Sequence, residues 1–168
     1  GEIHITDAIQ SLINEGIPIN QFIGLAHGIN STIVHIDEPS GLAYVIYNES
    51  IGDYSWGCDG TDVTGTSMEF GAGGNNTINL IISNCQVFDS EVSAAEACYY
   101  FEFDGWNDWY LPSANEIITV CSNTNLLSGT TAWSSSEEYS WAAMGKPNNV
   151  DITYCSETHS KALYLSVF

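Results

Sequence analysis

The spacing of apolar residues along this chain changes several times and predicts a series of short elements. Apolar positions three and four apart predict an amphipathic helix over residues 6–14, a second helix starting near Asn75 and a third over 90–100. Two apolar segments, 32–36 and 42–47, predict a pair of strands joined by a turn. Helices and strands that follow one another without regular alternation predict an α+β domain.

The segment 105–116 contains three aromatic residues and a proline and ends in a helix-start signal. Ser113 and Glu116 have the spacing of a capping box, in which each side chain accepts a hydrogen bond from the backbone N–H of the other residue. Pro112 has no N–H and favours an extended conformation at the residue before it. We therefore expect the chain to arrive extended and to leave as a helix that runs to about Cys121.

The C-terminal part is predicted to consist of short strands around 131–135, 140–144, 150–154 and 162–168. At 168 residues the chain suits one domain with a sizeable core. No apolar run approaches the roughly 20 residues that a membrane span needs, so a soluble protein is expected.

The string Asp108-Trp109-Tyr110-Leu111-Pro112-Ser113, followed by Glu116, resembles a motif of the family named after the C-terminal domain of the collagen-like bacterial adhesin Lcl. The resemblance covers roughly residues 33–168. Other matching pieces occur in the family's order: Ile33-Val34-His35-Ile36-Asp37, Trp56-Gly57-Cys58, Gly71-Ala72-Gly73 and Trp133-Ser134-Ser135-Ser136-Glu137.

This resemblance implies a C-type-lectin-like fold over residues 31–168, with two or three helices and several short, mostly antiparallel strands. In that fold the central motif is scaffold, and variable loops near the C-terminus form the binding face. The scaffold residues implied here are Trp106, Asp108, Trp109, Leu111, Pro112, Ser113 and Glu116.

Residues 1–30 precede the family match and are too apolar for a solvated tail. We expect them either to fold back on the domain or to pack against a neighbouring subunit. The residues expected at such an assembly contact are Ile9, Leu12, Ile13 and Phe22. An exposed apolar segment that fits another surface builds chains of subunits, so a homo-oligomer is expected.

The charge is one-sided, with 21 Asp and Glu, two lysines, no arginine and a net charge of −19. Such a surface repels nucleic acid and anionic lipid, because Lys and Arg carry phosphate binding. It also argues against sulfated or sialylated glycans, although the adhesin domain that gives the family its name is associated with sulfated glycosaminoglycans. We expect a secreted, cell-surface or virion protein in a saline setting.

Five cysteines are present, without CxxC spacing and without a histidine at metal-finger distance, so zinc is not expected. One or two disulfides in a secreted protein is one interpretation, and buried thiols that behave as small hydrophobes is the other. The resemblance implies a disulfide that joins Cys58 to Cys85 or Cys98.

Exposed aromatic residues combined with Asn, Asp and Ser are typical of carbohydrate and peptide sites. This mixture follows the central helix and predicts a ligand site made of Trp133, Ser135, Glu137, Glu138, Tyr139, Trp141, Asn148, Asn149 and Asp151. For the two tryptophans, a place in the core is the alternative.

Calcium is the metal considered, because it prefers hard oxygen ligands. Glu137, Glu138 and Asp151 form one candidate calcium site. A second acidic loop contains Asp53, Asp59 and Asp62.

An enzyme is not expected. The four histidines are scattered, and the chain has no Gly-x-Ser-x-Gly elbow, phosphate-binding loop or His-Glu-x-x-His motif. The sequence therefore predicts a non-catalytic recognition or adhesion domain that binds a glycan or a surface protein. The alternative is a structural subunit of an extracellular filament or phage appendage that assembles through its N-terminal segment.

Overall fold

The computed structural model describes residues 11, 14–18, 21–24, 30–37, 39, 42–58, 61–84, 92–125, 127, 132–138, 141–145, 152–155, 160–161 and 165–167. From residue 138 onward it describes the backbone only. Within these residues no helix is long and apolar enough to cross a membrane.

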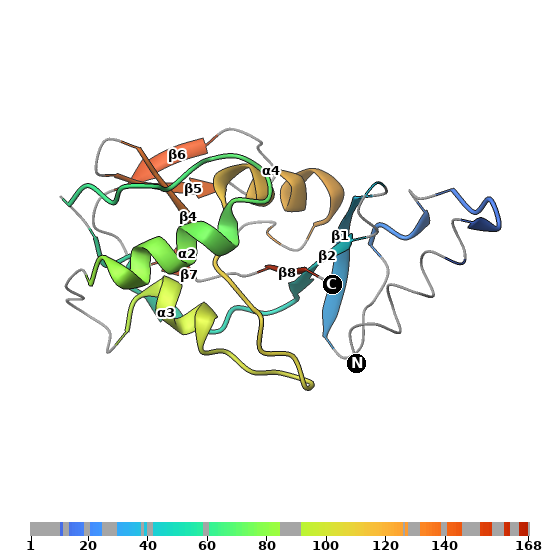
Figure 1. Cartoon of the computed structure of the whole chain (residues 1–168), viewed down its shortest axis with the longest axis horizontal. Helices are drawn as coiled ribbons and strands as arrows, with labels where there is room; N and C mark the ends of the chain where they lie inside the picture. Colours follow the sequence, from blue (N-terminus) through green and yellow to red (C-terminus); the bar gives the residue numbers. More distant parts are fainter. Residues whose placement is uncertain are drawn as a thin grey trace.

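The described residues form a mixed α+β arrangement of two sheets and three helices (Figure 1). The first sheet is antiparallel and has the order β1 (Ser31–Asp37), β2 (Leu42–Tyr47), β8 (Leu165–Val167). The second sheet has the order β3 (Asp53–Tyr54), β7 (Ser160–Lys161), β4 (Ala132–Glu138), β5 (Trp141–Gly145), β6 (Ile152–Cys155). Its pairs are antiparallel except β4 with β7, so the expected α+β class with mostly antiparallel strands is confirmed.

Helix α4 (Ala114–Asn123) connects the two sheets. It contacts β1 of the first sheet and β4 and β5 of the second. Helix α2 (Gly73–Ile82) packs on β4 and on α3 (Ala94–Tyr99), and Figure 1 shows α2 and α3 next to each other. The capping box predicted at the start of α4 is present, with the Ser113 N–H donating to Glu116 Oε2 at 2.6 Å.

Helix α3 is shorter than the predicted helix over 90–100 because a second capping box fixes its start. The Ser93 N–H donates to Glu96 Oε2 at 2.8 Å, and the Glu96 N–H donates to Ser93 Oγ at 3.2 Å. The same Ser-x-x-Glu pattern that identified the start of α4 is present here in the sequence.

The first sheet has two apolar faces, and its strand β1 contains a β-bulge. Ile33 pairs with Val45 and His35 pairs with Tyr44, so Val34 is an extra residue in the strand. Val34 packs against α4, and the His35 ring lies 5.8 Å from the ring of its strand partner Tyr44. On the other face, Ile33 and Val45 pack with the segment that precedes the sheet.

Part of the N-terminal segment packs within its own domain. Phe22 is 5% exposed and lies in one apolar cluster with Ile33 and Val45, with Ile17 and Ile23 packed beside it. Phe22 is therefore a core residue of this chain, which corrects its prediction as an assembly residue. The other predicted assembly residues, Ile9, Leu12 and Ile13, lie outside the described residues.

The described cysteines include one that forms a disulfide and two that are thiols. Cys58 is disulfide-bonded. Cys98 and Cys121 are thiols, so the predicted alternative Cys58–Cys98 is wrong. Cys98 is fully buried in the same apolar cluster as Cys58, and this burial raises the pKa of its thiol.

Candidate functional site

The predicted scaffold motif is buried at the junction of two apolar clusters. Trp109 and Leu111 pack in one cluster with Trp56 and Trp133, whereas Tyr110 packs in the other with α4. This alternation is that of an extended segment whose successive side chains point to opposite sides.

Glu116 is the polar centre of the scaffold and has no exposed surface. Its Oε1 accepts hydrogen bonds from the Gly71 N–H at 3.1 Å and the Tyr110 hydroxyl at 3.2 Å, and its Oε2 accepts from the Ser113 N–H. Burial raises the pKa of Glu116, and the hydrogen bonds from Ser113, Tyr110 and Gly71 offset part of this shift. The carboxylate therefore joins the loop before α2 to the start of α4.

The serines of β4 belong to the same buried polar network. Ser134, Ser135 and Ser136 have no exposed surface. The Ser135 N–H donates to the Pro112 carbonyl at 2.7 Å, and Ser136 Oγ accepts from the Ala114 N–H at 2.9 Å. These serines satisfy buried backbone groups of the scaffold motif, as buried polar groups in folded proteins do.

Two predicted ligand residues are thus structural. Trp133 is 1% exposed, and its Nε1–H donates to the Tyr54 carbonyl at 2.9 Å. Ser135 accepts from the Asn76 side-chain amide at 3.2 Å inside the core. Neither side chain presents a surface to a ligand in this fold, and Trp133 adopts the core position that was the alternative.

Glu137 lies partly exposed at the end of the serine run. Its Oε2 accepts from the Val63 N–H at 2.6 Å, and its Oε1 is buried without a hydrogen-bond partner among the described residues. Burial raises the pKa of Glu137, the hydrogen bond from Val63 lowers it, and the nearby Asp62 carboxylate raises it. The structure therefore brings together Asp62 and Glu137, which the sequence placed in two separate acidic groups.

This acidic pair does not by itself form a metal site. No group of three or more His, Cys, Asp or Glu suited to a metal ion occurs in the described part of the chain. The side chain of Glu138 and all of Asp151 lie outside it, so the calcium site stays a prediction.

The structure describes only some of the other predicted ligand residues. The backbones of Glu138 and Trp141 pair with each other across β4 and β5. Tyr139, Asn148, Asn149 and Asp151 lie outside the described residues. Their role in binding stays a prediction.

A tight hairpin precedes the scaffold motif and was not predicted. Asp104 and Gly105 have φ values of 52° and 78°, and Phe103 and Trp106 exchange backbone hydrogen bonds of 3.0 and 2.9 Å. Positive φ at both central residues is the geometry of a two-residue type I′ turn, for which Asp-Gly is a preferred sequence. The Asp-Gly pair between two aromatic residues was a signal for this turn.

Aromatic packing fixes the hairpin to the core. The Phe103 ring lies 4.8 Å from the Tyr47 ring and stacks on Phe101 at 6.1 Å with an interplanar angle of 13°. On the other arm, the Trp106 carbonyl accepts a hydrogen bond from Trp109 Nε1 at 3.2 Å. Both arms of the hairpin are therefore anchored to buried or half-buried rings.

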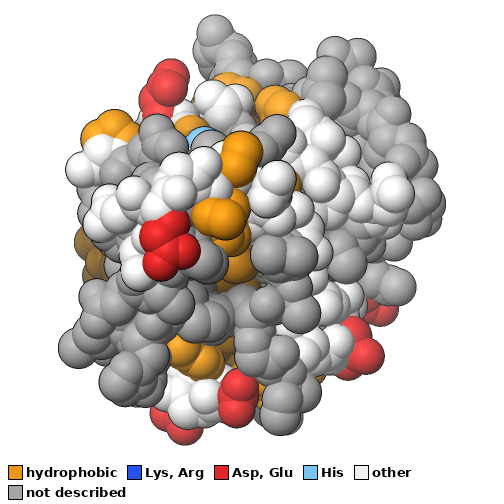
Figure 2. Space-filling model, turned by 90° about the vertical axis from the view of Figure 1, so that its right-hand side faces the viewer, with side chains coloured by type: hydrophobic (Ala, Val, Ile, Leu, Met, Phe, Trp, Pro, Cys, Tyr) orange, Lys and Arg blue, Asp and Glu red, His pale blue; other side chains and the backbone are white. Residues whose placement is uncertain are grey.

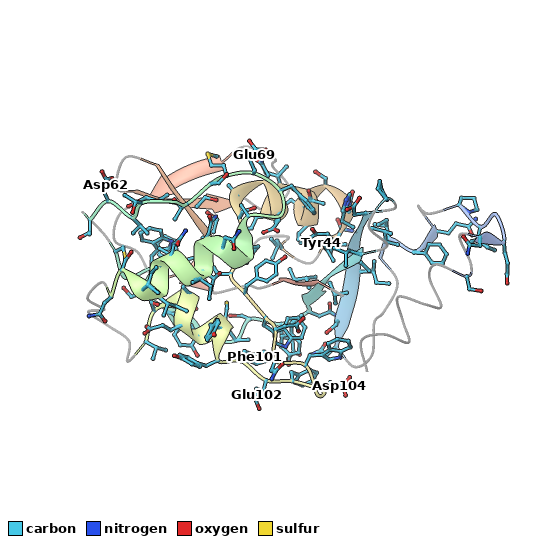
Figure 3. All side chains as sticks on the ribbon, viewed as in Figure 1. Tyr44, Asp62, Glu69, Phe101, Glu102 and Asp104 are labelled. Carbon is cyan, nitrogen blue, oxygen red and sulfur yellow. The ribbon has the colours of Figure 1, made fainter. Side chains whose placement is uncertain are left out.

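The hairpin surrounds an open hollow of about 240 Å³, which we name the hairpin site. Its lining consists of Glu102, Phe103, Asp104, Gly105, Trp106 and Asn107. The two aromatic side chains are half-buried, whereas Glu102, Asp104 and Asn107 are exposed. Figure 3 shows Glu102 and Asp104 at the lower edge of the molecule, directed away from its body, with Asp62 and Glu69 at the opposite edge.

Acidic side chains also occur outside the hairpin site (Figure 2). Figure 2 shows carboxylate groups at separate points of one face, around a band of hydrophobic side chains. The hairpin site differs from that distribution because it combines two carboxylates with two aromatic rings and an amide.

No family model and no curated protein matches the chain. The resemblance to the Lcl family therefore stays a prediction from its motifs.

Proposed function

We propose that this chain is a non-catalytic recognition or adhesion domain that acts outside the cell, as a secreted, cell-surface or virion protein. Its ligand is a glycan or a surface protein, and its scaffold is a C-type-lectin-like domain. The observation that carries this proposal is the hairpin site, where aromatic residues, carboxylates and an amide gather at an exposed type I′ turn.

The chemistry of the hairpin site suits binding. Aromatic rings offer apolar surface to the CH groups of a sugar or peptide, and a few polar groups around them set its orientation. The backbone hydrogen bonds and ring contacts hold the site in place before a ligand arrives, which reduces the entropy lost on binding.

The buried scaffold supports the same interpretation. The hydroxyl and carboxyl groups of Ser113, Ser136 and Glu116 are engaged with backbone groups or with other side chains inside the core. None of these groups is exposed to a substrate in this arrangement. These hydroxyl and carboxyl groups, whose types also occur in catalytic sites, thus have structural roles here.

The proposal is tested on an array of glycans and purified surface proteins. The double variant Glu102→Ala/Asn107→Ala removes two exposed polar side chains of the hairpin site. Its matched control is Glu69→Ala/Asn75→Ala, which removes the same residue types from exposed positions elsewhere. Ligands bound by the wild type and the control but lost by the hairpin variant support the proposal. Binding that both variants retain in full would locate recognition elsewhere, in the loops after Trp133.

Assembly into a filament or appendage is the second candidate, and exposed aliphatic residues favour it. Ile78 and Ile82 lie one turn apart on α2 and are 41% and 72% exposed. Because Ile17 and Phe22 pack on the first sheet, a deletion that probes assembly has to stop at residue 16. A folded monomer after this deletion, where the full chain is an oligomer by light scattering, would make the chain chiefly a building block. An unchanged mass would remove the N-terminal segment from assembly.

A further inference from the structure

We propose that the hairpin site takes a cationic glycan, that is, a sugar chain whose amino groups are not acetylated. This inference rests on the recognition function proposed above. It follows from the placement of carboxylates beside aromatic rings in one preorganised hollow.

The aromatic part of the site suits a sugar ring. Phe103 and Trp106 line the hollow and are half-buried, so part of each residue remains accessible. The electron-rich faces of aromatic rings attract cations as well as apolar CH groups. The hollow is smaller than the roughly 300 Å³ at which pockets for drug-sized ligands begin, so it suits a single unit of a longer chain.

The polar part of the site selects the charge of the ligand. Glu102 and Asp104, which flank Phe103 in the sequence, both line the hollow, and Asp108 follows on the other arm of the hairpin. A chain with a net charge of −19 repels anionic ligands at any distance that salt does not screen. An ammonium group is attracted by the whole molecule and then meets two carboxylates at this site. Hydrogen bonds between ammonium and carboxylate are among the stronger ones in proteins.

A neutral sugar can contact the aromatic residues of this site but cannot form an ion pair with its carboxylates. An N-acetylated sugar has the same ring and CH faces as its amino counterpart but no positive charge. Without the ammonium, the carboxylates of Glu102 and Asp104 gain no charged partner on binding. The comparison of these two sugars therefore isolates the part of affinity that the carboxylates contribute.

The test is isothermal titration of the full chain with an oligosaccharide of β-linked glucosamine and with the N-acetylated oligosaccharide of equal length. The charge variant Glu102→Gln/Asp104→Asn keeps the size of both side chains, and Asn tolerates the positive φ of residue 104. Its control, Glu69→Gln/Glu49→Gln, removes the same net charge from exposed positions outside the hairpin.

We expect the wild type to bind the amino oligosaccharide on the order of tenfold more tightly than the acetylated one, as charged hydrogen bonds imply. The charge variant should lose this preference and the control should keep it. Added salt should weaken binding of the amino oligosaccharide and leave the acetylated one nearly unchanged.

Four results would overturn the inference. Equal affinity of the wild type for both sugars would refute the role of charge and leave the proposed recognition function in place. An equal loss of preference in both variants would assign the effect to the overall charge instead of the hairpin site. Oligolysine that binds as tightly, with the same dependence on Glu102 and Asp104, would make the ligand a basic peptide. A wild type that binds no glycan at all would remove the glycan part of the proposed function as well.

Discussion

At Gly73, the addition of a single methyl group should destabilise the buried scaffold strongly. It is the first residue of α2 and is buried against Tyr110 and Glu116. A Cβ at this position would lie 2.5 Å from a carbon of the Tyr110 ring and closer still to Glu116 Oε2. Both neighbours are held by the network described above, so neither has room to move without breaking hydrogen bonds.

The expected cost of Gly73→Ala follows from these contacts. Forcing one extra carbon into a packed core costs about 1–3 kcal/mol. Weakening one hydrogen bond to the buried carboxylate of Glu116 adds about 1–3 kcal/mol. The greater helix propensity of Ala offsets at most about 1 kcal/mol, and less at the first helical residue. We therefore expect Gly73→Ala to lower the free energy of unfolding by about 2–4 kcal/mol.

The matched control is Gly74→Ala, one residue further along the same helix. A Cβ there would lie 3.9 Å from the Tyr110 ring, which is an ordinary contact. This variant should be neutral or more stable than the wild type by up to about 1 kcal/mol. Urea denaturation followed by tryptophan fluorescence measures both variants. A Gly73→Ala midpoint equal to that of the wild type, or equal losses in both variants, would refute the close packing of Gly73 on Glu116.

Three further predictions concern titration, the hairpin turn and the thiols. The pKa values of Glu116 and Glu137 are raised in the folded state, so the native protein takes up protons at a higher pH than the unfolded chain. The stability that these two groups contribute is therefore full below their unfolded pKa and is lost as pH rises through their folded pKa. The midpoint of thermal unfolding should be higher at about pH 5.5 than at about pH 8; a flat or opposite dependence in the wild type would contradict it. Gly105→Ala places a Cβ at a φ of 78° and should cost about 1 kcal/mol in urea denaturation, as a left-handed non-glycine residue does; an unchanged midpoint would speak against the type I′ turn. In the native protein, a thiol reagent should modify the half-buried Cys121 faster than the fully buried Cys98, and the reverse order by peptide mass mapping would contradict their placement.

Local signals in the sequence were sufficient to predict structure where the interacting residues are neighbours along the chain. Ser113 and Glu116 form their capping box within one helical turn, so the start of α4 could be predicted from their spacing. The Asp-Gly pair at residues 104 and 105 is an equally local signal for the hairpin turn. In these cases the local sequence alone determines the helix start or the turn.

The serine run of β4 could not be interpreted correctly from spacing alone. Three serines before two glutamates have the composition of a solvated loop. In the fold, Ser136 donates to the carbonyl of Ser67, and the backbone of Ser135 pairs with Pro112. These partners are far away in sequence, so the burial of the serines depends on tertiary contacts that periodicity does not report.

The scaffold and the hairpin site share one segment of chain, and this connects stability to binding. The Trp106 carbonyl accepts hydrogen bonds both from the Phe103 N–H, which closes the hairpin, and from Trp109 Nε1, which lies in the core. A change in the core that displaces Trp109 therefore acts directly on an arm of the hairpin site. Loss of ligand binding in a core variant is then expected without any contact to the ligand. For this reason, only exposed substitutions such as Glu102→Gln, with unfolding midpoints equal to that of the wild type, assign a binding role to the hairpin itself.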